Sequence, residues 1–477
     1  MQTMLARVAR LWRIFREPVP LETHRRLELS WARVPRRLRT RQQMLGRSSN
    51  GCGATIGVMP SCDFRCTGCY LSTDANRVPG LSLDDVKRQL DRLRAHLGER
   101  GNLQLTDGEV LLRPEQEVIE IVRYARGIGL EPMLMTHGDG LRKRPGLLDR
   151  LMIEAGLEEV GIHIDTTQRG RAGSAYRLAT DENELEPLRD EFAALLRCAR
   201  ERTGRPIRAA TLMTITRDNL ASVPGVIHWV QRNADVFRMI SFQPVAIVGR
   251  TRHGLGTIRA DELWEKIFEA LAPSGYPVDR LRGARMWLGH PDCNQHLVGL
   301  VSRQHGARPR FHPIRTPHDP VDVEVVDTIL DRFGRVSFKG DGLPEKAARI
   351  AGLAVRAPAL AATRAGPFAR HWLRRFDVER PWRFVGRLVT GRASVHQLSI
   401  VSHHFMSTAE ALTPRGRERM ELCVFHVPVG NRMISMCEAN ALGLREQLYV
   451  ELAGHGETPR QRDQLSSTTV RAVVHGG

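Results

Sequence analysis

Three closely spaced cysteines constrain this chain more than any other feature. Cys62, Cys66 and Cys69 follow the spacing C-x3-C-x2-C, directly after an apolar run at residues 54–59. Three thiolates on one tight loop can hold three irons of a 4Fe–4S cluster. The fourth iron then lacks a protein ligand and can bind a small molecule. The spacing therefore predicts an open iron–sulfur site on a loop that follows a strand.

Two other uses of clustered cysteines fit the chain less well. A disulfide framework is disfavoured, because the loop holds an odd number of cysteines, three, and only eight serve 477 residues. A structural zinc site closes its coordination with a fourth Cys or His, and none stands at that spacing here. The sparse cysteines also indicate a reducing compartment, so we expect a cytoplasmic protein.

Basic residues clearly outnumber acidic ones. The chain has 71 Lys and Arg against 53 Asp and Glu, a formal charge of +18. This excess favours an anionic partner such as nucleic acid, acidic lipid head groups or a phosphorylated substrate, and it can also serve solubility alone. The sequence has no apolar run of about 20 residues, so we expect no transmembrane helix. The first residues also lack the continuous apolar core of a secretory signal.

The N-terminal residues predict a basic amphipathic helix. Apolar side chains recur at helical spacing, arginines fill the other positions, and the first acid is Glu17. The apolar positions are Met4, Leu5, Val8, Leu11, Trp12 and Phe15, and the arginines are Arg7, Arg10, Arg13 and Arg16. Such a helix can lie on the inner face of an anionic membrane or dock on the protein's own core. Both hypotheses stay open.

From about Gly53 onward, short apolar runs alternate with amphipathic segments. We expect strands at 54–59, 103–105, 132–136, 160–164, 209–215 and 239–245. Helical patterns separate or follow them, one of them opened by a capping box at 82–85. Six strand–helix units predict an α/β fold with a parallel sheet, built as a partial (β/α)6 barrel of the TIM type.

The same pattern divides the chain into segments. We expect a basic extension at 1–50, the barrel core at 51–285, a connecting and basic helical segment at 286–395, a small cysteine-containing domain at 396–453 and a loose tail at 454–477. Residues 273–341 are rich in proline and predict an irregular connection. Residues 343–389 interleave aromatic residues with arginines, which suits nucleic acid, a membrane interface, a lipid channel wall or two packed helices.

Polar or glycine-rich residues follow every expected strand. The cysteine loop follows the first, and the later exits carry Thr106-Asp107-Gly108-Glu109, Thr136-His137-Gly138-Asp139, His163-Ile164-Asp165, Thr214-Ile215-Thr216 and Gln243-Pro244-Val245. In a parallel barrel the active groups gather at the carboxyl ends of the strands. Six polar exits in register with a metal loop therefore predict one active site at that end.

Together, the cysteine loop and the strand exits resemble the radical S-adenosylmethionine (SAM) superfamily over about residues 53–271. The resemblance implies that Cys62, Cys66 and Cys69 ligate a 4Fe–4S cluster whose open iron is chelated by SAM. Two positions depart from the family pattern, because Asp107 replaces a glycine and Gly68 stands where an aromatic residue is usual. The residues assigned to the SAM site are Tyr70, Gly108, Glu109, His163, Asp165 and Gln243.

The resemblance also implies a chemistry. An electron from the reduced cluster splits a C–S bond of SAM, and the 5′-deoxyadenosyl radical removes hydrogen from an unactivated carbon. The expected electron donor is a protein such as flavodoxin or ferredoxin. The protein's own part is to exclude water, place the substrate and tune the cluster.

Later motifs resemble the tetraether lipid synthase group of that superfamily, whose members join the methyl ends of lipid chains. The resemblance implies an auxiliary cluster on Cys293, Cys423 and Cys437, with Cys52 or a histidine as fourth ligand. The alternative is that Cys423 and Cys437 are buried apolar thiols. The chain departs from the archaeal enzymes in having a cysteine-free N-terminal extension. The motifs are 242–245, 249–250, 290–293, 403–406, 423–426 and 434–440.

Several functions remain open on the sequence alone. The leading hypothesis is a radical reaction on a lipid chain or another apolar substrate at the membrane surface. A radical methyltransferase or modifying enzyme acting on RNA is supported by the charge, although nucleic acid is the less favoured partner. A peptide-modifying enzyme with an auxiliary cluster is a third hypothesis. A non-catalytic iron–sulfur scaffold is a fourth, and the open coordination site counts against it.

Overall fold

The computed structural model describes residues 2–171, 174–334, 336, 343–377 and 380–454. The chain forms two compact units. The core unit comprises residues 51–222, 241–259 and 403 onward, and the helical unit comprises 1–50, 223–240 and 260–402. Most of the tail expected at 454–477 lies outside the described residues.

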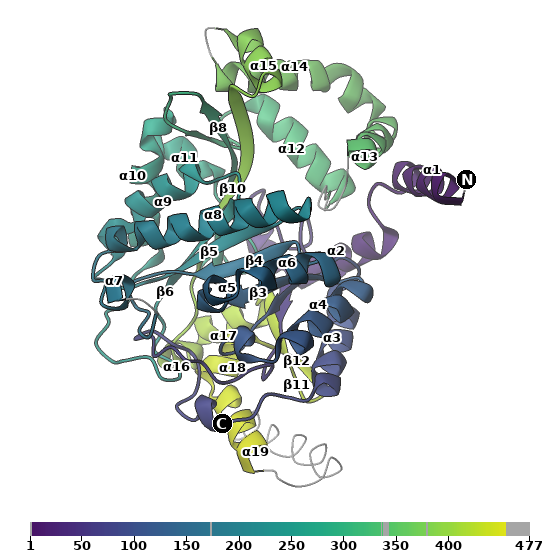
Figure 1. The fold of residues 1–477 in the computed structure, drawn as a ribbon. Helices are drawn as coiled ribbons and strands as arrows, with labels where there is room; N and C mark the ends of the chain where they lie inside the picture. The colour runs from purple at the N-terminus through teal and green to yellow at the C-terminus, as the bar shows by residue number, and fades with distance from the viewer. Residues whose placement is uncertain (1, 172–173, 335, 337–342, 378–379, 455–477) are drawn as a thin grey trace. The chain divides into compact units, whose positions relative to one another are not determined.

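Five parallel strands run in chain order through the core unit (Figure 1). They are β1 (Cys52–Ala54), β2 (Asn102–Leu105), β3 (Glu131–Thr136), β4 (Glu159–His163) and β5 (Arg208–Ile215). The sixth, β6 (Phe237–Pro244), ends in the same unit, where the Val245 N–H donates a 2.9 Å hydrogen bond to the Ile215 carbonyl. The prediction of a partial (β/α)6 barrel is confirmed.

Helices of the core unit form a layer on these strands. They are α3 (Leu83–Leu97), α4 (Glu115–Gly127), α5 (Asp139–Lys143), α6 (Pro145–Glu154), α7 (Ser174–Arg177) and α8 (Glu186–Thr203). Neighbours in the order α3, α4, α6 and α8 pack on one another. Helix α3 begins as predicted, because the Ser82 hydroxyl accepts a hydrogen bond from the Asp85 N–H, and it buries Val86, Leu90, Leu93 and Leu97.

The first strand begins two residues before the expected 54–59 and shares only Ala54 with that range. It ends at Ala54, and the chain then turns at Gly57, whose φ of 74° lies in the left-handed region. The Asp107 carboxylate accepts a 2.5 Å hydrogen bond from the Gly57 N–H, which replaces a ladder bond. Beyond the strand, the Thr55 N–H donates to the Gln104 carbonyl at 3.1 Å, and an isolated bridge pairs Met59 with Gly108.

The C-terminal segment extends the core sheet. Strand β11 (Phe425–Val429) pairs in parallel with β1, and β12 (Arg432–Ser435) pairs antiparallel with β11. The helices of this segment are α16 (Thr408–Ala411), α17 (Pro414–Glu421), α18 (Met436–Ala441) and α19 (Leu444–Gly454). Helix α18 begins with a capping box between Ser435 and Glu438. These residues therefore belong to the same compact unit as the barrel strands.

The helical unit contains more regular secondary structure than the sequence predicted. The expectation of an irregular stretch at 273–341 is wrong, because β8 (Asn294–Gln304) pairs antiparallel with β7 (Met286–Trp287) and β9 (Arg310–Pro313). Gly299 allows strands β8 and β9 to lie close together, since a Cβ at this position would lie 2.4 Å from the Phe311 ring. The other elements are α1 (Gln2–Arg16), α2 (Leu21–Arg33), α9 (Val223–Arg232), α10 (Ala260–Leu271), α11 (Val278–Ala284), α12 (Pro320–Phe333), α13 (Leu343–Arg356), α14 (Pro358–Phe376), α15 (Pro381–Val389) and β10 (Ala393–His403).

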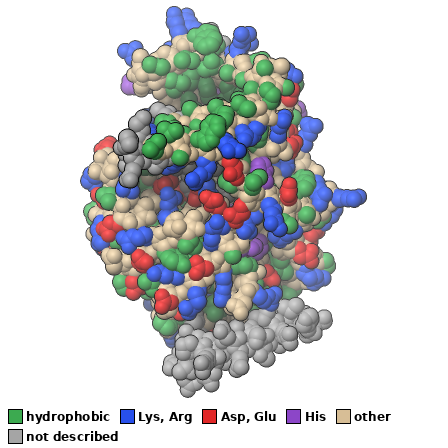
Figure 2. Space-filling view, turned by 90° about the vertical axis from the view of Figure 1, so that its right-hand side faces the viewer, with side chains coloured by type: hydrophobic (Ala, Val, Ile, Leu, Met, Phe, Trp, Pro, Cys, Tyr) green, Lys and Arg blue, Asp and Glu red, His purple; other side chains and the backbone are tan. Residues whose placement is uncertain are grey.

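Most of the interleaved aromatic residues are buried in this unit. Trp372, Phe376 and Phe384 form one apolar cluster with Ala393, whereas Trp382 is exposed. The packed-helix alternative therefore accounts for most of this segment. Over most of the face shown in Figure 2, Lys and Arg side chains are interspersed with Asp and Glu. Among the described helices, none is both long and apolar enough to cross a membrane.

Candidate functional site

The cysteine loop is anchored by backbone bonds from two other strand exits of the core unit. The Thr67 N–H donates to the Thr167 carbonyl at 2.8 Å, and the Arg252 N–H donates to the Thr67 carbonyl at 2.9 Å. The Cys69 N–H donates to the Thr251 hydroxyl at 3.0 Å. The loop is thus held between the segments that follow β4 and β6.

The three thiols line one cavity, and their surroundings suit metal thiolates. The Phe64 N–H donates to the Cys62 Sγ at 3.4 Å, and the Arg250 Nε–H donates to the Cys69 Sγ at 3.2 Å. Burial raises the pKa of Cys62 to about 12 and raises the pKa of Cys66 further. Thiols this hard to ionise need a cation to become thiolates, and N–H···S bonds stabilise thiolates once formed. The donor set therefore fits an iron–sulfur cluster.

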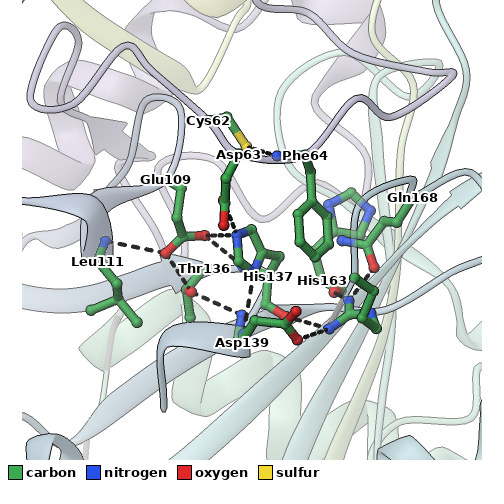
Figure 3. Close-up of polar contacts among 12 residues, drawn as sticks. Cys62, Asp63, Phe64, Glu109, Leu111, Thr136, His137, Asp139, His163 and Gln168 are labelled. Carbon is green, nitrogen blue, oxygen red and sulfur yellow. Dashed lines mark hydrogen bonds and ion pairs between the residues drawn. The ribbon is translucent and has the colours of Figure 1, made fainter. Parts of the chain in front are cut away.

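His137, at the exit of β3, packs against the cysteine loop (Figure 3). Its ring stacks on the Phe64 ring at a centroid distance of 3.7 Å. Its Nδ1 accepts a hydrogen bond from the Asp139 N–H, so Nε2 carries the proton and donates to the Asp63 carboxylate at 2.8 Å. This bond lowers the pKa of Asp63. The Arg171 guanidinium also lies over the Phe64 ring, 5.1 Å from its centroid.

Glu109 is buried in the cavity wall, and several donors fix its carboxylate (Figure 3). It accepts hydrogen bonds from the Leu111 N–H at 3.1 Å, the Thr136 hydroxyl at 2.6 Å and the His137 N–H at 2.9 Å. The preceding Gly108 has a φ of 63°, and a Cβ there would lie 2.1 Å from the Met59 carbonyl oxygen. The turn therefore requires glycine and presents a preorganised acceptor to the cavity.

Asp107, the first departure from the family pattern, has a structural role. Its φ of 119° is one that glycine adopts readily and other residues rarely adopt. Its carboxylate accepts short hydrogen bonds from the Arg445 guanidinium and the Tyr449 hydroxyl, both on α19. Burial opposes the charge of Arg445, but Asp107 outweighs that effect and raises the pKa of Arg445. The strand exit is thereby tied to the C-terminal helix.

The same guanidinium also covers Tyr70, which follows the third cysteine. The Arg445 guanidinium lies 4.8 Å from the centre of the Tyr70 ring, within range of a cation–π contact. Burial, and then the Asp107 carboxylate, raise the pKa of Tyr70 to about 12. The Tyr70 hydroxyl lies 3.4 Å from the Thr106 hydroxyl. Tyr70 is thus a neutral, fixed part of the cavity wall.

Gly68, the second departure, is explained by close packing. A Cβ at this position would lie 3.2 Å from methyl groups of both Thr214 and Val245. The exits of β5 and β6 therefore occupy the space that a side chain would need. An aromatic residue before the third cysteine would therefore require the Thr214 and Val245 side chains to shift.

His163 and Asp165 form a coupled pair at the exit of β4. Their Nε2 and Oδ2 atoms are 2.6 Å apart, and the His163 Nε2 also lies 3.2 Å from the Thr214 hydroxyl. Burial opposes the charge of Asp165, but His163 and the hydrogen bonds from Thr167 and Thr214 outweigh it and lower the pKa of Asp165 to about 2. Asp165 lies behind the wall and orients His163, which itself lines the cavity.

The structure brings most predicted site residues to this one cavity. Its wall continues from the thiols to an apolar side contributed by the C-terminal segment through Phe405, Phe425 and Met436. Asp165 alone of the predicted SAM residues lies outside the wall. The predicted residues that line the cavity are Cys62, Cys66, Cys69, Tyr70, Gly108, Glu109, His163 and Gln243.

The later cysteines have separate surroundings within their own units. The Cys423 Sγ accepts a 3.4 Å hydrogen bond from the Phe425 N–H in the core unit. Cys437, also in the core unit, is buried among apolar side chains that include Val248. Cys293 belongs to the helical unit, where its N–H donates to the His290 carbonyl at 3.0 Å. Ligation of an auxiliary cluster by these residues stays a prediction.

Several residues of the site were not predicted from the sequence to have a role in it. Asp63, Phe64 and His137 were visible as part of the loop and a strand exit, but only the fold shows that they stack and bond. No sequence pattern pointed to Arg445, because it lies 338 residues from its partner Asp107. Arg250 stood in a quoted motif, and its bond to a cluster thiol was not foreseen.

Comparisons with known proteins agree with this geometry. Residues 56–230 match the sequence model described as "Radical SAM superfamily". The 7,8-dihydro-6-hydroxymethylpterin dimethyltransferase of Methanocaldococcus jannaschii is 30% identical over 199 residues, which is 41% of this chain and 37% of that protein. The chain thus matches little more than a third of this relative's length.

The solved structures that match parts of the chain have lower sequence identities. SuiB of Streptococcus suis bound to S-adenosylmethionine has a TM-score of 0.34 and 13% identity, with 47% of this chain and 48% of that chain covered. Coproporphyrinogen III oxidase of Escherichia coli, described as a radical SAM enzyme, has a TM-score of 0.32 and 14% identity, with 65% and 62% covered.

Proposed function

We propose that this chain, a radical SAM iron–sulfur enzyme by its residues 56–230, removes hydrogen from an unactivated carbon of an apolar, lipid-like substrate. The observation that carries the proposal is the apolar wall of Phe405, Phe425 and Met436, which faces the same cavity as the cluster thiols. When a cluster reduced by a donor such as flavodoxin or ferredoxin and SAM are both bound, they would supply a 5′-deoxyadenosyl radical that can remove hydrogen from such a carbon.

The chain's own residues divide the work. Cys62, Cys66 and Cys69 hold the cluster, and the Arg250 Nε–H bond to the Cys69 sulfur stabilises its thiolate. The fixed Glu109 carboxylate receives the amino group of SAM. The apolar side chains exclude water and leave a hydrocarbon as the substrate best matched to the wall.

Carbon–carbon bond formation between lipid chains is the specific reaction that we favour. One hydrogen would leave each of the two joined carbons and end in 5′-deoxyadenosine, so that two molecules of SAM and two electrons from the donor would be used for each bond. It is supported by the later motifs that resemble the tetraether lipid synthase group, among which Phe405, Phe425 and Met436 occur. An auxiliary cluster that includes Cys423 and Cys437 belongs to the same proposal.

A second candidate is methyl transfer to a polar heterocycle. It is supported by the relative named as a pterin dimethyltransferase, although the matched part is little more than a third of that protein. Gln243 and Asn440 give the cavity two amides that could bond to a ring edge. The apolar wall is what makes this candidate the weaker one.

Isotope transfer separates the two candidates. The reconstituted enzyme is reduced with SAM and a phospholipid whose acyl chains are fully deuterated, and 5′-deoxyadenosine is analysed by mass spectrometry. We expect deuterium in 5′-deoxyadenosine, reduced at least about tenfold by Phe405→Asn and largely kept by Phe405→Leu. Absence of deuterium, together with methylation of 7,8-dihydro-6-hydroxymethylpterin from labelled SAM, would instead establish the second candidate.

A further inference from the structure

We infer that the α1–α13 face of the helical unit binds the surface of an anionic lipid bilayer. This face is defined by the exposed apolar side chains of α1 and α13 and by the arginines of α1. The inference rests on the helical unit alone. It adds to the proposed function the surface from which a lipid substrate would be taken.

One flank of α1 is docked on α13. Gly352 lies against the Phe15 backbone, where a Cβ would approach the Phe15 carbonyl oxygen to 2.4 Å. The Arg356 guanidinium donates to the Phe15 carbonyl at 3.1 Å and to the Arg16 carbonyl. These contacts cap the end of α1 and fix how the helix is rotated. The core-docking hypothesis for this helix is therefore correct for one flank only.

The other flank of α1 is an exposed apolar stripe. Leu5, Val8 and Trp12 are 65%, 55% and 59% exposed, and their spacing of three and four residues places them on one side of the helix. Single exposed apolar residues are common, but an ordered stripe beside basic residues is typical of helices that lie in a membrane interface. Helix α13, on which α1 packs, also has exposed apolar side chains at Ile350 and Val355.

The charge of α1 complements an anionic surface. The helix carries four arginines and no acid. Arg13 and Arg16 line a hollow together with Trp12, and Glu17, Val19 and Phe333 also line it. Within the described part of the chain, neither of these two arginine side chains forms an ion pair. Figure 2 shows hydrophobic side chains gathered with Lys and Arg on the upper part of the face turned toward the viewer.

These features favour a bilayer over nucleic acid. Phosphates of either partner would attract the arginines, but only a bilayer offers an apolar phase for Leu5 and Val8. Trp12, with an apolar ring and a polar N–H, suits the boundary between head groups and acyl chains. Its ring also stacks on that of Phe15 at 5.6 Å, which orients it.

Vesicle flotation of the full chain tests the inference. The probes are vesicles of phosphatidylglycerol and phosphatidylcholine, and vesicles of phosphatidylcholine alone. We expect binding to the anionic vesicles that weakens with salt, and loss of that binding in the Leu5→Glu/Trp12→Glu variant. An Arg13→Ser/Arg16→Ser variant should bind more weakly by about fivefold for each arginine removed.

The matched control is Leu178→Glu/Leu412→Glu, which adds the same two charges at positions that are 78% and 63% exposed in the core unit. It should bind like the unaltered chain, and thermal unfolding should show that all variants remain folded. Equal binding to both kinds of vesicle, equal binding by the α1 variants, or preferential retention of RNA over vesicles would overturn the inference. Deuterium transfer from detergent-dispersed lipid would survive such a failure, so the docking face and the proposed chemistry are tested separately.

Discussion

Asp107, which stands where the family pattern has a glycine, forms a buried ion pair with Arg445. A glycine would adopt its φ of 119° without strain, yet the chain places an acid there and joins it to Arg445. The side chains of both residues are almost fully buried. A buried pair of this kind costs little while complete and much when one partner is removed.

Arg445→Met should therefore destabilise the protein by about 3–5 kcal/mol, because it leaves the Asp107 carboxylate buried without its partner. The double variant Asp107→Gly/Arg445→Met should recover a large part of this loss, since it removes the orphaned charge and relieves the backbone. Denaturant unfolding measures both free energies.

The surface variant Arg88→Met, which breaks an exposed pair with Asp85, is the control and should cost no more than about 1 kcal/mol. A double variant as unstable as Arg445→Met would show that the pair itself is not the source of the effect.

Arg250 offers a second prediction at this scale. Its Nε–H bond to the Cys69 sulfur should tune and hold the cluster. Arg250→Met is expected to lower the rate of 5′-deoxyadenosine formation about 10–100-fold, the usual cost of removing a group that supports a metal ligand. Redox titration should show a shifted cluster potential. The neighbouring exposed Arg252, replaced by Met, should leave both quantities unchanged.

At the scale of elements, the site depends on how loops from different strands pack together. Gly68 faces the exits of β5 and β6, and His137 at the exit of β3 stacks on the loop. The sequence predicted that these exits meet, because parallel strands end at one edge. Which side chains touch was beyond it, because contacts such as that of Gly68 with Val245 depend on the twist of the sheet.

The packing at Gly68 is directly testable. Gly68→Phe should cost about 1–3 kcal/mol through overpacking against Thr214 and Val245 and should lower the iron content of the purified protein. Gly146→Phe is a suitable comparison, because an added Cβ at Gly146 meets nothing within 4 Å. Full iron content in the Gly68 variant would show that the loop can move to admit a ring.

For the whole molecule, the succession of the six barrel strands and the polar exits around the cysteine loop were predicted from patterns along the chain. The missed features are those that need distant residues. Strand β8 was not predicted, because its apolar run at 297–301 is short. It also lies outside the repeated strand–helix pattern, since it pairs antiparallel with β7 and β9. The partnership of Asp107 and Arg445 spans 338 residues. Local periodicity carries no information about either.

The number of clusters is a property of the whole chain. After anaerobic reconstitution we expect about eight irons for each chain, the sum of two four-iron clusters. The double variant Cys423→Ser/Cys437→Ser should contain about four irons, with the first cluster intact. A value of about four in the unaltered chain, unchanged by the replacement, would remove the auxiliary cluster from the account.

The central claim is that Cys62, Cys66 and Cys69 hold an open cluster that cleaves SAM. The most direct measurement is the amount of 5′-deoxyadenosine formed from SAM by the reduced, reconstituted enzyme. We expect clear formation by the unaltered chain and none by Cys66→Ala, with Cys198→Ala, an exposed cysteine on α8, behaving like the unaltered chain. Continued formation of 5′-deoxyadenosine by Cys66→Ala would contradict the claim.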